Sequence, residues 1–374
     1  MTPPPLSDVR RQYEDLKEEI DAAVAAALSS GQYILGPLAA RFEEAFAAFC
    51  GAGFGIGVGN GTDAVRIALQ ASGVRPGDKV VTVANAGVPP VAAIHAARAE
   101  PVFVDVEADT GNLDVTALQK LTDPKVKAVL VVHLFGHPVD LQAISAVARS
   151  RDWKLIEDCS HAHGALYRGQ RVGSFGDAAA FSFYPTKNLG AAGDAGIVTT
   201  NSDAIADRAR LLRNYGWRSD RVSEVPSDHS RLDEIQAAVL LTKLPHLELW
   251  NAQRRALAAK YCTLLEGWVG LPVQRDWAHA VHHLFVIRTA DRDGLARHLT
   301  AKGIGTGIHY APAVYRHPAF LNVALSAQCP VTELRGAQIL SLPMYPELTE
   351  AQVELVASAI KEFLGEKGRG LPVD

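Results

Sequence analysis

FSFYPTKNLGAAGDAG, residues 181–196, carries the strongest structural signal in this 374-residue chain. It starts with the end of an apolar run, AAAFSF, and continues into a polar, glycine-rich turn that presents Lys187. GIVTT follows directly, so the turn joins two predicted strands. A lysine in such a turn is ordinarily just solvated, so its significance depends on its neighbours.

Five further strand-like runs and the helices between them extend this pattern over residues 55 to 200. Several runs are apolar on both faces, which is typical of strands in a parallel or mixed sheet covered by helices. The alternation predicts an α/β layered fold. The seven predicted strands are FGIGVG, KVVTVA, PVFVDV, KAVLVVH, WKLIED, AAAFSF and GIVTT, and the helices between them include DAVRIALQASG, VAAIHAARA and DLQAISAVARSR.

A second, smaller unit is predicted after a long helical stretch at residues 233–267, which Pro245 should kink or break. We expect a large domain over residues 1–248, with a helical arm at its start, and a small α/β domain over residues 249–374. The small domain is predicted to contain strands at residues 282–289 and 303–310 (GIGTGIHY), and helices in DGLARHLTAKG and TEAQVELVASAIKEFLGE.

The composition is that of an ordinary globular protein, with 48% hydrophobic and 21% charged residues. A net charge of −4 lacks the basic excess that nucleic-acid binding requires, so we expect no nucleic-acid partner. The four cysteines form no C-x-x-C pair and are expected to be reduced. No apolar run approaches 18 residues and the first residues lack a signal-peptide pattern, so we expect a cytoplasmic protein with no membrane partner.

Asp158 ends the predicted strand WKLIED, which places a carboxylate at the sheet edge where α/β folds bind ligands. An aspartate there could equally cap the next helix. Together with Lys187, however, it supplies what pyridoxal 5'-phosphate (PLP) needs: an amine for a Schiff base and a carboxylate against the pyridine nitrogen. We therefore predict a PLP site in which Lys187, once released by an incoming amine, is the general acid and base.

A phosphate site is predicted at GNGTDAV, residues 59–65, where a glycine-rich turn enters a helix. The free amides at the helix start near Gly61, with the Thr62 hydroxyl, suit an anion. The competing dinucleotide fingerprint G-x-G-x-x-G fails, because its last position falls on Asn60 or Thr62. His161 and His163 form H-x-H without a partner at zinc-site spacing, so no metal is expected.

With these motifs in place, the chain resembles the sugar aminotransferases of the DegT/DnrJ/EryC1/StrS group, within the fold type I PLP enzymes. The resemblance covers nearly the whole chain and implies a large domain with a mostly parallel seven-stranded sheet flanked by helices, a smaller C-terminal domain, and a homodimer with shared active sites. The segments that carry it are GQYILGPLAARFEEAFAAFCGA, GNGTDAV, VVHLFGHPVDL, IEDCSHAHGA, GSFGDAAAFSFYPTKNLGAAGDAG, RNYGW, SRLDEIQAA, GIHYAPAVYRHPAF and SLPMYPELT.

The resemblance also implies roles for individual residues. Lys187 corresponds to the lysine that forms the aldimine and Asp158 to the pyridinium partner. His161 corresponds to the Gln or His that approaches the cofactor's ring hydroxyl. The remaining matches are Gly61, Thr62 and Ser182 for the phosphate, and His309 and Tyr310 near the mouth of the active site, where substrate binds.

Two positions depart from the family pattern. His229 stands where an asparagine commonly reaches the neighbouring subunit's phosphate, and histidine can still donate to phosphate. Gly87 stands where an aromatic residue often stacks on the cofactor ring, which leaves either another residue or the substrate itself as the stacking partner.

The function that the resemblance implies is transfer of an amino group from an amino acid, by analogy L-glutamate, to a nucleotide-linked keto-deoxysugar through pyridoxamine phosphate. A PLP-dependent sugar dehydratase is an alternative, but those relatives carry histidine in place of the lysine, and Lys187 argues against it. A non-catalytic PLP-binding regulator is a second alternative, although no basic DNA-binding helix is appended. The sequence leaves open the sugar carbon, the nucleotide carrier and the pathway.

Overall fold

The computed structural model describes residues 2–321 and 328–366, and its centre is a seven-stranded sheet. All seven predicted strands are present. Only β9 runs antiparallel to its neighbours, so the sheet is mostly parallel, as expected. In spatial order the strands are β1 (Phe54–Val58), β9 (Gly196–Thr200), β8 (Ala178–Ser182), β5 (Lys154–Asp158), β4 (Val126–Val132), β2 (Lys79–Val83) and β3 (Glu100–Val104).

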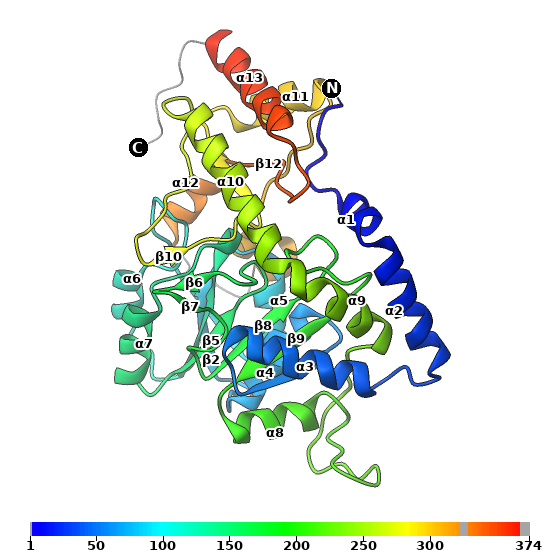
Figure 1. The fold of residues 1–374 in the computed structure, drawn as a ribbon. Helices are drawn as coiled ribbons and strands as arrows, with labels where there is room; N and C mark the ends of the chain where they lie inside the picture. The colour runs from blue at the N-terminus through cyan, green and yellow to red at the C-terminus, as the bar shows by residue number, and fades with distance from the viewer. Residues whose placement is uncertain (1, 322–327, 367–374) are drawn as a thin grey trace.

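Helices cover both faces of this sheet (Figure 1). Side chains alternate along each strand, so Leu130 of β4 joins one hydrophobic core while Val129 and Val131 join the other. The first core is completed by α4 (Gly61–Ala71), α5 (Val88–Ala96) and α8 (Asp203–Leu212). The second is completed by α3 (Pro37–Cys50), α6 (Val115–Gln119), α7 (Leu141–Ser150) and α9 (Glu234–Lys243).

The long helical stretch predicted at residues 233–267 is broken where Pro245 was expected to break it. A 3₁₀ turn, η2 (Leu244–His246), separates α9 from α10 (Leu247–Leu265). Proline lacks the amide that would continue the α-helical ladder, which explains the break. In Figure 1, α10 then leads from the sheet into the C-terminal part of the chain.

The C-terminal part has its own core, built from α10, a two-stranded sheet and two further helices, α11 (Arg292–Ala301) and α13 (Glu350–Glu366). The predicted division into domains at residue 248 stays a prediction, and residues 322–327 and 367–374 of the small domain lie outside the described residues. The elements are β11 (Phe285–Arg288), α11, α12 (Pro330–Gln338), β12 (Ile339–Leu342) and α13, with the 3₁₀ turns η3 (Val314–Arg316) and η4 (Pro318–Phe320).

The strand predicted at residues 303–310 is wrong, because only Gly307 makes an isolated bridge, to Ser341. The partner of β11 is instead β12, a four-residue run that the sequence pattern did not reveal. The glycine-rich segment packs against the N-terminal residues: a Cβ on Gly305 would lie 2.4 Å from the amide nitrogen of Leu6. The glycines therefore allow two backbones to approach, rather than marking a strand.

The N-terminal segment ties the beginning of the chain to the C-terminal part. Gly305 N donates to the Pro4 carbonyl at 3.0 Å, and Met344 N donates to that of Leu6 at 3.2 Å. Two helices, α1 (Val9–Asp15) and α2 (Lys17–Ser29), then lead to the sheet. The remaining short elements are η1 (Leu134–Gly136), β6 (Leu166–Tyr167), β7 (Gln170–Arg171) and β10 (Ala278–His279). Within residues 2–321 and 328–366, no helix combines the length and apolarity needed to span a bilayer.

Candidate active site

A cavity of about 690 Å³ lies at the carboxyl ends of β1, β5 and β8, which is where ligands bind in sheets of this kind. Eight of the nine predicted site residues line it, and His229 does not. Its volume is that of a cofactor or small-molecule site. The predicted residues that line it are Gly61, Thr62, Asp158, His161, Ser182, Lys187, His309 and Tyr310.

Asp158 is the last residue of β5 and is buried, with 4% of its surface exposed. Its Oδ1 accepts a hydrogen bond from the Ser160 amide at 3.0 Å, which orients the carboxylate at the cavity. The preceding residue, Glu157, does not line this cavity and accepts instead from the amides of the loop that includes Gly173 and Phe175. Asp158 therefore contributes its carboxylate to the cavity, whereas the carboxylate of Glu157 stabilises the fold through these hydrogen bonds.

Lys187 lies in a turn after β8, and its amide donates to the Tyr184 carbonyl at 2.8 Å. The turn is fastened to α9, because Lys243 Nζ donates to the Gly190 carbonyl at 2.9 Å. Burial lowers the pKa of Lys187 to about 8, although the nearby charge of Asp158 opposes the shift. The amine is therefore deprotonated near neutral pH far more often than an ordinary lysine, as a nucleophile must be.

This shift predicts the pH dependence of cofactor capture. Only the neutral amine of Lys187 attacks the aldehyde of PLP, so the capture rate of cofactor-free protein should rise with pH to a midpoint near about 8. Stopped-flow absorbance over a pH series measures it, with free lysine as the reference. A midpoint as high as the ordinary lysine value of 10.5 would contradict the burial argument.

The start of α4 lies at the cavity, where the sequence predicted an anion site. Asn60 caps the helix, its Oδ1 accepting from the Asp63 amide at 2.8 Å. The amides of Gly61 and Thr62 have no acceptor within their own helix and so remain available to a phosphate. No arginine lines the cavity in the described part of the chain, so the helix start is its main anion-binding feature. The cavity, the amine, the carboxylate and these amides fit PLP.

Gly61 is required by a close approach. A Cβ there would lie 2.4 Å from Cβ of Ser182 at the end of β8, a distance that side chains do not tolerate. We expect Gly61→Ala to separate α4 from β8 and to weaken PLP binding at least about tenfold, since overpacking costs about 1–3 kcal/mol. Equilibrium titration of the cofactor measures this.

Gly53→Ala is the matched control, because a Cβ at Gly53 meets ordinary contacts at 3.6 Å or more. Its affinity for PLP should equal that of the parent. Equal affinities of the two variants would show that the contact between α4 and β8 does not govern phosphate binding.

His161 is buried and makes two long hydrogen bonds. Its Nδ1 accepts from the Phe135 amide at 3.4 Å, and its Nε2 lies 3.4 Å from the Tyr310 hydroxyl. Burial, with the charge of Lys187 as a second cause, holds the pKa of His161 well below its ordinary value. The ring is therefore neutral, and since Nδ1 accepts, its proton lies on Nε2, where it can be donated to an oxygen in the cavity.

Tyr310 fills the space beside Gly87. Gly87 has a φ of 76°, and a Cβ there would lie 3.2 Å from the Tyr310 ring. The aromatic ring missing from position 87 thus has a counterpart that comes from the C-terminal part of the chain. Burial raises the pKa of Tyr310 to about 12, with the charge of Asp158 as a further cause, so its hydroxyl stays protonated.

The two remaining predicted residues lie in different places. His309 lines the cavity, and its Nδ1 lies 2.8 Å from Oγ of Ser341 at β12. His229 lies outside it, exposed, with its ring 5.1 Å from that of Tyr215. Its role toward a neighbouring subunit stays a prediction.

The sequence did not single out several residues that line the cavity. His283 lies just before β11, and its only sequence signal is the histidine pair 282–283 ahead of a strand. Leu6 and Ser7 reach the cavity from the N-terminal segment, where nothing in the local pattern indicates it. Ser160 and Asp194 lie within the segments that also contain Asp158 and Lys187, and their nearness to these two residues in the sequence is the signal for their place in the cavity.

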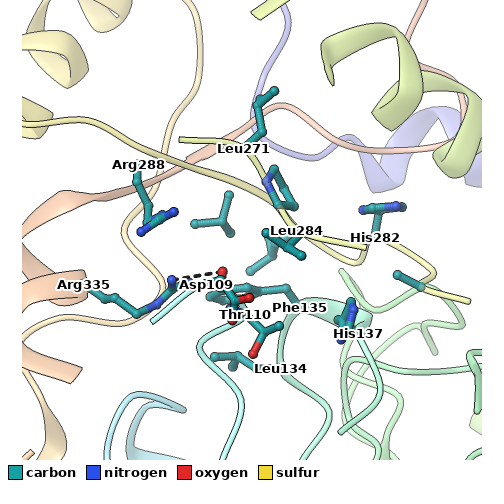
Figure 2. A pocket seen from close by; sticks show the side chains of 14 residues that line it. Asp109, Thr110, Leu134, Phe135, His137, Leu271, His282, Leu284, Arg288 and Arg335 are labelled. Atoms are coloured by element: carbon teal, nitrogen blue, oxygen red, sulfur yellow. Dashed lines mark hydrogen bonds between the residues drawn. The ribbon is translucent and has the colours of Figure 1, made fainter. Parts of the chain in front are cut away.

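Two other features are weaker candidates for a ligand site. A second cavity of about 40 Å³, shown in Figure 2, lies between Phe135, Leu284 and Arg335 and holds no more than water. His133, Glu157 and Cys159 form the one cluster, within residues 2–321 and 328–366, that could hold a metal. Both nitrogens of His133 and both oxygens of Glu157 are already hydrogen-bonded, so the cluster is a structural network.

A lysine and a buried carboxylate at the carboxyl edge of a mostly parallel sheet, beside a helix start for phosphate, define a PLP-dependent enzyme. The comparison with known families agrees. The chain belongs to the DegT/DnrJ/EryC1/StrS aminotransferase family, whose model matches residues 14–361. It is a PLP-dependent aminotransferase.

Among sequence relatives, the chain is 43% identical to dTDP-3-amino-3,4,6-trideoxy-alpha-D-glucose transaminase of Streptomyces venezuelae, over 96% of each chain. It is 42% identical to a protein of Geobacillus stearothermophilus named pleiotropic regulatory protein, over 96% of this chain and 98% of that one.

Solved structures give the same family. DesV of Streptomyces venezuelae, in complex with a ketimine intermediate, superposes with a TM-score of 0.93 at 42% identity, over 97% of this chain and 99% of that one. A Bacillus subtilis protein with bound cofactor PMP gives 0.90 at 28% identity, over 98% and 86%.

Proposed function

We propose that this aminotransferase moves an amino group from L-glutamate to the ketone of a nucleotide-linked keto-deoxysugar. The observation that carries the proposal is the pairing, in one cavity, of the Lys187 amine with the buried carboxylate of Asp158. The relative named as a dTDP-sugar transaminase, 43% identical over 96% of the chain, supports the sugar substrate.

The chain's own residues have separable tasks in this reaction. PLP supplies an electron sink when bound. Asp158 holds a proton at the ring nitrogen, and neutral His161 donates its Nε2 proton to the ring hydroxyl. With PLP bound, the Lys187 amine would take the proton from Cα of the donor amino acid and deliver it to the former aldehyde carbon of the cofactor, on the other side of the shared nitrogen atom. The phosphate is held by Gly61, Thr62 and Ser182, while Tyr310 covers the ring beside Gly87 and, with His309, meets the sugar.

The two alternative functions fit less well. A dehydratase of this group would carry histidine at the lysine position, and Lys187 is present. The name of one relative, pleiotropic regulatory protein, is the observation that favours the alternative of a regulator. Yet Lys187 and Asp158 line one cavity of about 690 Å³, which leaves room for a substrate beside the cofactor, and a protein that only stores the cofactor does not need that room.

We further propose a cytoplasmic homodimer with shared active sites. The cavity lacks an arginine among its described lining residues, so the diphosphate of a nucleotide sugar needs cations from outside the chain. Tyr33, Ile34 and Leu35 are exposed apolar side chains that a second copy would cover, and His229 is exposed and free to reach it. Four free cysteines suit a reducing compartment.

The test is a two-step assay. Purified protein loaded with PLP is mixed with L-glutamate, and the cofactor spectrum should convert to that of the amine form. The converted protein is then offered a panel of dTDP-, UDP- and GDP-linked keto sugars, and mass spectrometry identifies the aminated product. Conversion with glutamate but with no keto sugar would overturn the substrate class, and sequence-specific DNA binding without conversion would favour the regulator.

A further inference from the structure

His283 lies at the point where the C-terminal part of the chain meets the turn that carries Lys187. It lines the active-site cavity with only 7% of its surface exposed. Its ring lies 4.5 Å from that of His161, and its Nδ1 lies 3.1 Å from Oδ1 of Asn188, the residue after Lys187. None of the tasks proposed above uses His283.

The direction of this hydrogen bond is fixed by a buried chain of amides. Asn251 on α10 donates its Nδ2 to the His163 carbonyl at 2.8 Å, so its Oδ1 is left to accept. Asn188 Nδ2 donates to that Oδ1 at 2.9 Å, and also to the Val281 carbonyl at 3.0 Å. Because a backbone carbonyl can only accept, both asparagine side chains have one possible orientation.

It follows that Oδ1 of Asn188 is an acceptor and that Nδ1 of His283 carries the proton. Burial, with His161 as the second cause, holds the pKa of His283 well below its ordinary value, so the ring is neutral. The histidine therefore exists as one tautomer, a donor toward Asn188 with a lone pair on Nε2. The turn is thus tied to α10 through Asn251 and to the segment before β11 through His283.

We propose that His283 is a positioning residue, which fixes the turn at Asn188 so that the amine of Lys187 meets the reacting atoms. The proposal rests on the proposed function, in which one amine must take a proton from one carbon atom and return it to another. Such a transfer is sensitive to placement, since a displacement of about 1 Å costs up to about 100-fold in rate. Lys243 and Gly190 fix the far side of the turn, but Asn188 is the fixed residue beside the lysine.

Three variants of His283 separate its possible contributions. His283→Phe keeps a ring against His161 but removes the donor. His283→Asn retains a donor close to the Nδ1 position, whereas His283→Gln places its polar group near the Nε2 position. The matched control is His282→Phe, because His282 points into the small second cavity of Figure 2 and not into the active site.

The measurements are kcat and KM for L-glutamate, the rate of PLP capture by cofactor-free protein, and thermal unfolding. His283→Phe should lower kcat and the capture rate about 10- to 100-fold, with KM within about threefold, because both processes need the placed amine of Lys187. His283→Asn should recover both rates to within about threefold of the parent's. The control His282→Phe should have the same two rates as the parent.

Each other outcome overturns the proposal. Recovery by His283→Gln but not by His283→Asn would assign the role to Nε2 in direct contact with ligand. A loss of rate that follows lowered thermal stability and equally affects His282→Phe would show a structural role alone. If His283→Phe had the kcat and the PLP capture rate of the parent, His283 would have no role in positioning Lys187. A parent protein that neither captures PLP nor reacts with glutamate would instead refute the proposed function.

Discussion

Lys187→Ala is expected to abolish transamination, with kcat falling by at least about 10³- to 10⁴-fold, because one residue provides both the covalent link to PLP and the proton transfer. No other amine in the described cavity lining can replace it. The variant should still bind PLP, since the helix start and Asp158 remain. Single-turnover kinetics with glutamate measure the loss, and a dialysed sample should release its cofactor.

Lys187→Arg is the matched control, because it keeps the positive charge but cannot form the link. It should be as inactive as the alanine variant, which would show that loss of the positive charge is not the reason for the lost activity. Full transamination activity of Lys187→Ala or Lys187→Arg would refute the assignment of Lys187 as the amine that links to PLP.

The pKa of Lys187 also affects the stability of the cofactor-free protein. The folded-state pKa of Lys187 is about 8, below its ordinary value of 10.5, so below about pH 8 the charged amine costs stability. The melting temperature of cofactor-free Lys187→Ala should therefore exceed the parent's at pH 7, and the excess should shrink as the pH rises from about 8 to 10.5.

Asp158→Asn is expected to lower kcat by about 100- to 1,000-fold, the usual cost of removing one preorganised charge at a reaction centre. Asparagine has the same shape but cannot hold a proton at the ring nitrogen, so the ring accepts electrons poorly. Stability should change little, because the Ser160 amide can still donate to the remaining oxygen. Steady-state kinetics and thermal unfolding are measured together.

Glu157→Gln is the matched control for that variant. Glu157 is the adjacent residue on β5, and its two oxygens accept from His133, Gly173, Phe175 and Gly176. An amide NH₂ would face donors on either side, so we expect a loss of about 2–3 kcal/mol in stability but kcat within about threefold of the parent. If Glu157→Gln lost activity and Asp158→Asn did not, the roles of the two carboxylates would be reversed.

The features that could be predicted from the sequence are those that depend on the pattern of apolar and turn residues within a short segment. All seven sheet strands were confirmed, because each is a short apolar run bounded by turn residues. The placement of Lys187, Asp158 and Gly61 around one cavity follows from the same strands, since parallel strands bring their carboxyl ends to one edge.

What the sequence could not predict depends on contacts between distant segments. Residues 303–310 have the glycine spacing that also suits a strand, and only the docking of Leu6 against Gly305 excludes it. The ring beside Gly87 comes from Tyr310, more than two hundred positions away along the chain. His283 acquires its place through Asn188 and Asn251, whose pairing no periodicity encodes.

The docking of residues 4–6 against Gly305 and Met344 also affects when the protein becomes able to bind its cofactor. On the ribosome, the first residues leave the exit tunnel long before their partners are made. The sheet can assemble early, but the cavity wall formed by Leu6 and Ser7 must wait for residue 344. Chains stalled before that point would hold Lys187 and Asp158 in an open cleft, so stable loading with PLP is an event of the nearly finished polypeptide.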